Sequence, residues 1–288
     1  MASMRDIKRR KGSIQSTQQI TKAMKLVSTV KLQKAKANAE KSQDYFRCMY
    51  NTVQSILART GNLEHRFLKP GAEGKKAVIV ITSNRGLAGG YNSNVTKLIT
   101  RGELAKEDLC IYAIGKKGKE ALQKSYEIKA DYSDVIEEPV YVDAMNISKE
   151  VLDAFARGEI SEIYLAYTAF KNTVVHEPTL LRLLPVEINE KEEEKSGDAV
   201  EDKTLMNFEP EDEEALDLII PKYITSLIYG GMVESVASEN GARMQAMDSA
   251  TSNAEEMIDN LTLLYNRARQ GSITQELTEI IAGANAIS

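Results

Sequence analysis

The stretch that decides the fold is MQAMDSATSNAEEMIDNLTLLYNRA, residues 244–268. Small and apolar residues recur in it at strictly alternating intervals of three and four, at Met247, Ala250, Ala254, Met257, Leu261, Leu264 and Ala268. This spacing predicts a helix with one narrow face buried in a coiled-coil seam of about three heptads. Beyond Ala268 the phase slips, which indicates a change of neighbour near Gly271, and a second stripe follows at Ile273, Leu277, Ile280 and Ala284.

The opposite end of the chain predicts the partner helix. From residue 3 to about 58 there is no proline and a single glycine, and apolar residues recur at helical spacing at Ile7, Ile14, Ile20, Met24, Val27, Met49, Val53 and Ile56. At a rise of ~1.5 Å per residue this helix would be about 80 Å long. Two long helices with one narrow apolar face each most simply bury those faces on each other in an antiparallel pair.

Between these helices the pattern changes to that of strands. Short β-branched runs alternate with helix-like stretches, the runs being Lys75–Thr82, Leu109–Ile114 and Ile160–Ala166, and the extended segment Asn172–Glu187 is broken by two prolines. This alternation predicts a small, mostly parallel, Rossmann-like α/β domain. The predicted organisation is therefore an N-terminal helix over 1–60, the α/β domain over 70–208 and a C-terminal helix over 210–288.

Charge is distributed unevenly along the chain. The net charge is −5, yet residues 1–41 contain eleven Lys and Arg against two acids, and residues 187–217 contain fourteen acids against three Lys. Such charged stretches are normally solvated faces or tails, but the basic one lies on a predicted helix, so an acidic partner is kept as an alternative. The acidic segment Glu190–Lys203 is expected to be an exposed, mobile loop.

Few residues suggest chemistry. Cys48 and Cys110 have no ligand-like spacing, and with only two histidines, His65 and His176, we expect no metal site and no cofactor. The turn RGLAGGYN, residues 85–92, stands where a dinucleotide-binding loop would stand, but its G-x-x-G-G spacing lacks both common phosphate-binding patterns. Its glycines serve equally well in a tight strand-to-helix crossover, and nucleotide binding is kept as the alternative.

Three glycines and one proline bear on the shape of the predicted C-terminal helix. Gly230, Gly231 and Gly241 in the C-terminal helix indicate either close helix packing or local compliance, and Pro221 indicates a helix start or a kink.

The longest uninterrupted apolar runs fall far short of the ~20 residues of a membrane span. The N-terminus lacks the apolar core of a signal peptide, which predicts a cytosolic protein.

The chain closely resembles the gamma subunit of rotary F-type ATP synthase in its bacterial form. The resemblance is carried by DIKRRKGSIQSTQQITKAMKLVSTVKLQKA (residues 6–35) and YNRARQGSITQELTEIIAGANAI (residues 265–287). VIVITSNRGLAGGYNSN (78–94) resembles that family's first strand and glycine turn, and ASENGARMQAMDSAT (237–251) resembles its C-terminal helix. The resemblance covers essentially the whole chain.

This resemblance implies a central rotor shaft without chemistry of its own. The paired terminal helices would turn inside a hexamer of alpha and beta subunits, and the α/β domain would sit on the c-subunit ring and bind the epsilon subunit. Rotation would couple proton flow to ATP synthesis, with the chain peripheral to the cytoplasmic side of the cell membrane. Matching motifs imply contacts with the beta subunit at Met24, Lys25, Arg243, Gln270 and Thr274.

Two other classes of function remain as alternatives. A Rossmann-type enzyme with helical appendages would bind nucleotide as the isolated chain. A nucleic-acid-binding coiled coil would use the basic helix, although residues 1–44 contain no aromatic side chain on which bases could stack.

Overall fold

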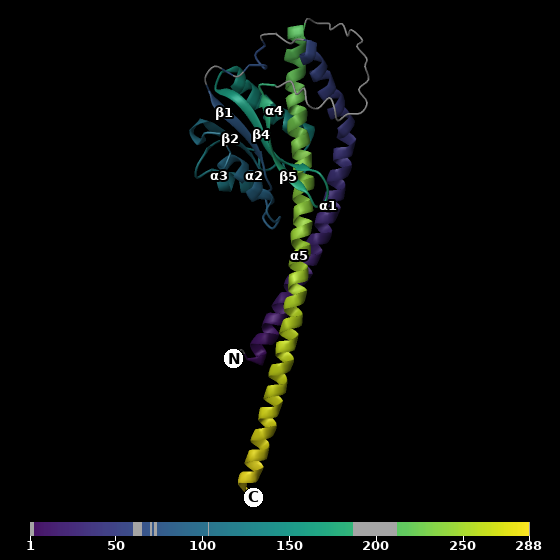
Figure 1. Cartoon of the computed structure of the whole chain (residues 1–288), viewed down its shortest axis with the longest axis vertical. Coiled ribbons are helices and arrows are strands. Elements are labelled where there is room, and N and C mark those ends of the chain that lie inside the picture. Colours follow the sequence, from purple (N-terminus) through teal and green to yellow (C-terminus); the bar gives the residue numbers. More distant parts are fainter. Residues whose placement is uncertain are drawn as a thin grey trace. The chain divides into compact units, whose positions relative to one another are not determined.

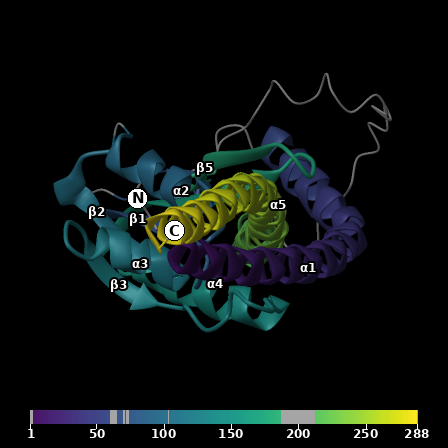
Figure 2. The same cartoon turned by 90° about the horizontal axis from the view of Figure 1, so that it is seen from below.

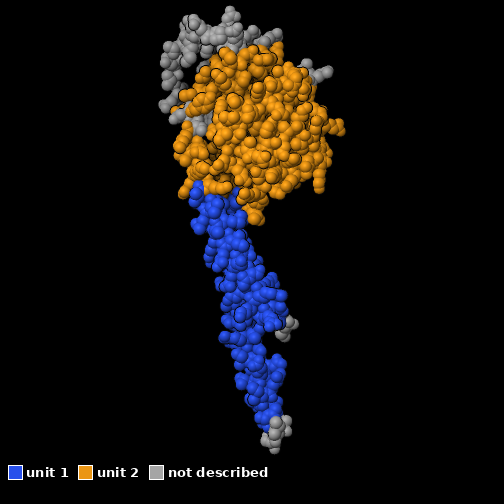
Figure 3. Space-filling model, turned by 180° about the vertical axis from the view of Figure 1, so that it is seen from behind, with its two compact units in different colours: residues 1–30, 243–288 blue, residues 31–242 orange. Residues whose placement is uncertain are grey.

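Two long helices occupy the ends of the chain, as the spacing predicted. The computed structural model describes residues 3–59, 65–69, 71, 74–102, 104–186 and 212–287. Helix α1 spans Met4–Arg59 and helix α5 spans Asp212–Ile287. The chain divides into two compact units, which Figure 3 colours separately: unit 1 contains residues 1–30 and 243–288, and unit 2 contains residues 31–242. Glu190–Lys203, the predicted acidic loop, lies outside the described residues.

Unit 2 contains a five-stranded sheet (Figure 1), whose strand order is β3-β2-β1-β4-β5. Four strands are parallel, and the edge strand β5 runs antiparallel to β4. The strands are β1 (Lys75–Ile81), β2 (Leu109–Ile114), β3 (Glu127–Asp131), β4 (Ile160–Phe170) and β5 (His176–Leu184). The predicted mostly parallel α/β sheet is confirmed, with β3 as a strand that the sequence did not indicate.

Helices cover both faces of this sheet. The other helices are α2 (Tyr91–Thr100), the short 3-10 helix η1 (Lys106–Asp108), α3 (Lys116–Leu122) and α4 (Tyr141–Ala156). Side chains of α2 and α3 pack with Val78 and Val80 of β1 in one core cluster. Side chains of α4, α5 and the end of α1 pack with Ile79 and Ile81 in the other. Because a parallel strand is buried on both faces, β1 reads as a continuous apolar run.

Glycines allow α5 to approach the sheet closely. A Cβ added at Gly231 would lie 2.9 Å from Leu165 Cδ2, and one added at Gly241 would lie 2.7 Å from His176 Cε1. At these two positions the structure therefore favours close packing over local compliance. Pro221 lies inside α5, nine residues after its start, and its carbonyl oxygen accepts a hydrogen bond from Thr225 Oγ1 at 2.8 Å.

One described helix is long and apolar enough for a membrane span by length and composition, which the short unbroken apolar runs did not indicate. Within Leu216–Asn285 of α5, an 18-residue window reaches a mean hydropathy of 1.2, so α5 meets the length and composition of a span. Single polar residues interrupt this part of α5, so its mean hydropathy is not apparent from the length of unbroken apolar runs. However, 56% of that window is buried inside the protein, as is usual for a helix in the core of a folded domain.

A glycine packed against the sheet and a glycine in open space should respond in opposite ways to a larger side chain in α5. Gly231→Val should lower the free energy of unfolding by about 1–3 kcal/mol, because the added methyl groups must displace Leu165. Gly271→Ala should stabilise the helix by roughly 1 kcal/mol, because beyond the adjacent residues and backbone of its own helix no atom lies within 4 Å of the added Cβ. Urea unfolding of the full chain followed by circular dichroism measures both. Equal effects of the two changes would contradict the packing described for Gly231.

Candidate functional site

In unit 1 the start of α1 lies beside α5, as Figures 1 and 2 show from two directions. Seven buried or half-buried positions of α1 follow a strict heptad spacing, with the half-buried Met4, Met24 and Thr29 beside them: Ile7, Lys11, Ile14, Gln18, Thr21, Lys25 and Ser28. Only two of these seven residues are apolar. The predicted stripe was therefore partly wrong, because Ile20 and Val27 each remain 58% exposed.

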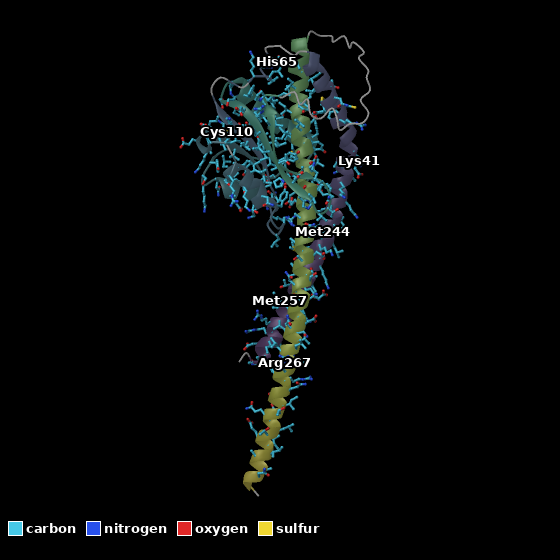
Figure 4. The ribbon with its side chains drawn as sticks, viewed as in Figure 1. Lys41, His65, Cys110, Met244, Met257 and Arg267 are labelled. Atoms are coloured by element: carbon cyan, nitrogen blue, oxygen red, sulfur yellow. The ribbon has the colours of Figure 1, made fainter. Side chains whose placement is uncertain are left out.

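The facing positions of α5 also follow a heptad, in a different phase from the predicted one. The heptad series of buried or half-buried positions is Met247, Thr251, Ala254, Ile258, Leu261, Tyr265 and Ala268, and the predicted seam residue Ala250 is half-buried beside it, as is Thr262. Met247, Ala254, Leu261 and Ala268 were predicted for this seam. Met257 (labelled in Figure 4) and Leu264 were predicted for it too, but they are 53% and 50% exposed, and Thr251, Ile258 and Tyr265 replace them. Apolar character alone could not identify a seam that accepts a threonine and leaves a leucine outside.

A buried hydroxyl pair lies at the centre of the seam. Thr21 Oγ1 and Thr251 Oγ1 are 2.7 Å apart, and both residues are 8% exposed. Each hydroxyl also reaches a carbonyl of its own helix, Gln18 O at 3.0 Å for Thr21 and Met247 O at 2.8 Å for Thr251. One hydroxyl can thus donate across the pair while the other donates to its own helix, so that neither is left without a partner.

Charged and amide groups flank the hydroxyl pair. Lys25 Nζ lies 2.6 Å from Asp248 Oδ1, and Glu255 lies 3.2 Å from Gln18 Nε2 and 3.6 Å from Lys22 Nζ. Residue numbers rise along α1 as those of their partners fall along α5, so the two helices are antiparallel, as predicted. The two ion pairs are largely solvent-exposed, and such pairs contribute about 0–1 kcal/mol each.

The residues implied to face a beta subunit all belong to unit 1. Met24 and Arg243 are half-buried, and Lys25 is the seam residue paired with Asp248. Gln270 and Thr274 are exposed one turn apart, and the Gln270 carbonyl accepts from Thr274 Oγ1 at 2.9 Å. The structure thus brings Lys25 against α5 and joins Gln270 to Thr274. Thr21, Thr251, Asp248 and Glu255 were not predicted as contact residues, although their spacing along the two helices follows the heptad.

The glycine-rich turn after β1 is closed by its own side chains. Asn92 Oδ1 accepts from the Ser83 amide at 2.9 Å, and Asn84 Oδ1 accepts from the Lys116 amide at 3.0 Å. Leu87 and Gly89 both have positive φ, 65° and 56°. These contacts give the turn a structural role in the crossover from β1 to α2. No group of three His, Cys, Asp or Glu among the described residues is placed to hold a metal ion.

Comparison with known proteins decides the family. The model of the family described as ATP synthase matches residues 3–287. The ATP synthase gamma chain of Lachnoclostridium phytofermentans is 66% identical over 291 residues, covering 100% of both chains. The chain belongs to the ATP synthase gamma chain family.

A further relative shows the variety of this family, and a solved structure shows the same fold. The "ATP synthase gamma chain, sodium ion specific" of Acetobacterium woodii is 41% identical and covers 99% of each chain. A chain in the structure of the Euglena gracilis mitochondrial ATP synthase (OSCP/F1/c-ring) superposes with a TM-score of 0.66 at 19% identity, covering 99% of this chain and 94% of that one. At this identity the likeness establishes the gamma chain fold, helix pair and α/β sheet included.

Two leucines of α5 separate the observed seam from the predicted one. Leu261→Asp should destabilise the helix pair by roughly 2–5 kcal/mol, because it places a charge in the buried seam. Leu264→Asp, the same change three residues on, should be tolerated because that side chain is half exposed. Hydrogen exchange of amides in 14–28 and 247–265 of the full chain measures the opening. Comparable loss of protection in both variants would mean that Leu264 also lies in the seam.

Proposed function

We propose that this gamma chain is the central rotor shaft of an ATP synthase and performs no chemistry itself. The helices assigned to 1–60 and 210–288 form the shaft, and the domain assigned to 70–208 forms a foot. The shaft turns inside a hexamer of alpha and beta subunits. The foot binds the c-ring and the epsilon subunit, which leaves the chain peripheral to the cytoplasmic face of the cell membrane.

The observation that carries this proposal is the unequal length of the paired helices in unit 1. Because α1 starts at Met4 and Thr21 faces Thr251, the seam runs out near residue 268, and α5 continues to Ile287. Within residues 269–285 of this extension, the large apolar side chains are all exposed: Ile273, Leu277, Ile280 and Ile281. A single helix with an uncovered apolar stripe fits a sleeve supplied by other subunits.

The basic end of α1 suits contact with an acidic part of the beta subunit. Residues 1–41 carry an excess of nine positive charges, and only some of them are used within the chain. Lys25 pairs with Asp248, and Lys34 donates to Glu138 at 2.9 Å, an interaction that lowers the pKa of that carboxyl group. We propose Met24, Lys25, Arg243, Gln270 and Thr274 as beta-facing positions, where Lys25 exchanges Asp248 for an acidic group of beta at little cost.

The proposed coupling ion is the proton. The family also includes the sodium-specific relative from Acetobacterium woodii, so membership alone is compatible with either ion. ATP-driven acidification of vesicles that contain the whole complex, abolished by a protonophore, is the expected result. Sodium uptake that persists with the protonophore would replace the proton by sodium and leave the shaft proposal intact.

Assembly tests the shaft proposal itself. When co-expressed with the alpha and beta subunits, the chain should co-purify with them in a complex that hydrolyses ATP, and the isolated chain should hydrolyse none. A chain cut after Gly271 removes the exposed apolar stripe but keeps the seam, so it should co-purify more weakly with the helix pair intact. Full-length chain that never associates with alpha and beta would exclude the proposal.

Removing the Lys25–Asp248 ion pair should have a small effect on ion pumping. Exchanging its two charges should rescue the larger loss caused by Lys25→Asp alone. Lys25→Ala should change ion pumping per ATP less than about five-fold, because an exposed pair contributes only about 0–1 kcal/mol. Lys25→Asp should impair pumping more, and adding Asp248→Lys should restore most of it if the seam contact dominates. Lys8→Ala, a change at an exposed lysine of the same helix, is the control. A swap that leaves pumping impaired would assign Lys25 chiefly to the beta subunit.

A further inference from the structure

His176 joins the end of the β4–β5 hairpin to helix α5 within unit 2. It is the first residue of β5 and pairs with Phe170, the last residue of β4, with ring centroids 5.9 Å apart. Its Cε1 and Nε2 atoms face Gly241 so closely that an added Cβ there would lie 2.7 Å and 3.0 Å from them. The hairpin end therefore rests on the helix through an imidazole ring placed against bare backbone.

Both ring nitrogens of His176 are buried without a hydrogen-bond partner among the described residues. A neutral imidazole has one donor and one acceptor, and a protonated one has two donors. Leaving such groups unsatisfied is costly, and the cost is larger for the charged form. Burial accordingly lowers the pKa of His176 below its ordinary value, so the ring is neutral in this packing.

Charged groups lie near this contact on the hairpin, on α1 and on α5. Lys171 and Glu177 on the hairpin lie 3.8 Å apart, and Lys36 of α1 lies over the Phe170 ring, 5.1 Å from its centroid. On α5, Glu234 Oε2 accepts from the Phe170 amide at 3.2 Å, and Glu239 follows five residues later. None of these groups reaches a His176 nitrogen, so none compensates a positive charge on the ring by a hydrogen bond.

We propose that His176 is a pH-sensitive latch, whose neutral ring seats the β4–β5 hairpin end on α5 at Gly241 and whose protonation releases it. Above the ordinary histidine pKa the ring is neutral in both the seated and the released states. As the pH falls through about 6.5, the released ring takes up a proton first, and the seated state loses stability. Burial raises the pKa of Glu234, so its packing becomes easier on acidification, which is the opposite sign.

Hydrogen exchange of the full chain at about pH 7.5 and about pH 5.5, corrected for the intrinsic exchange rate, tests the latch. The opening equilibrium of amides in 168–177 and 234–242 should rise about ten-fold at the lower pH, because a released histidine is then about nine-tenths protonated. His176→Gln should abolish this rise. His65→Gln should preserve it, because His65 Nε2 is already paired with Asp217 at 3.0 Å.

Gly241→Ala supplies an independent variant, since its methyl group should unseat the ring and open the hairpin at both pH values. The latch would be overturned by a ten-fold rise that persists in His176→Gln, or by one that disappears in Glu234→Gln alone. A nuclear magnetic resonance titration that gives His176 an ordinary midpoint near 6.5 in the folded chain would overturn it as well.

Discussion

The seam between α1 and α5 in unit 1 is the contact on which the proposed shaft depends, and it is unusually polar. Its centre is a threonine–threonine hydroxyl pair flanked by ion pairs, and its apolar members include alanines that bury little area. A seam of this kind gains less from the hydrophobic effect than a leucine-rich one, since burial contributes about 25 cal/mol per Å². Its hydrogen bonds are directional, however, and a polar pair in a coiled coil specifies which residues face each other.

A seam that combines weak apolar burial with specific polar pairing suits a shaft that would turn inside other subunits. Leu26, Val27, Val30, Met257 and Leu264 stay exposed outside the seam although it contains polar residues such as Thr21, Thr251 and Lys25. In the proposed hexamer these side chains would meet alpha and beta subunits. A seam that mixes polar and apolar residues, beside exposed apolar side chains, differs from the usual pattern of a two-stranded coiled coil.

Unit 2 follows the more common pattern, and its sequence was correspondingly easier to interpret. The apolar run of β2 gave both of its ends correctly, because a buried parallel strand is apolar on both faces. Strand β3 was missed because its exposed and half-buried residues alternate at a sheet edge, with Glu127, Lys129 and Asp131 on the exposed side. Such a strand is defined by its pairing with β2, which no local pattern records.

The seam was predicted only in part for a related reason. Heptad spacing correctly indicated two long helices and four of the α5 seam positions, yet it could not choose between Met257 and Ile258 or between Leu264 and Tyr265. That choice is made by the partner helix, whose facing residues include Thr21 and Lys25. The His176 contact was also invisible in sequence, since it depends on a glycine 65 residues away.

Rotation itself tests the central claim most directly. Cys48 is exposed and Cys110 is buried, so a bead can be attached at Cys48 of unit 2 while a hexamer of cysteine-free alpha and beta subunits is fixed to a surface. With ATP present, the bead should turn continuously in one direction, and Leu261→Asp should reduce the fraction of turning complexes. A complex that hydrolyses ATP at full rate while the bead on this chain stays still would contradict the account.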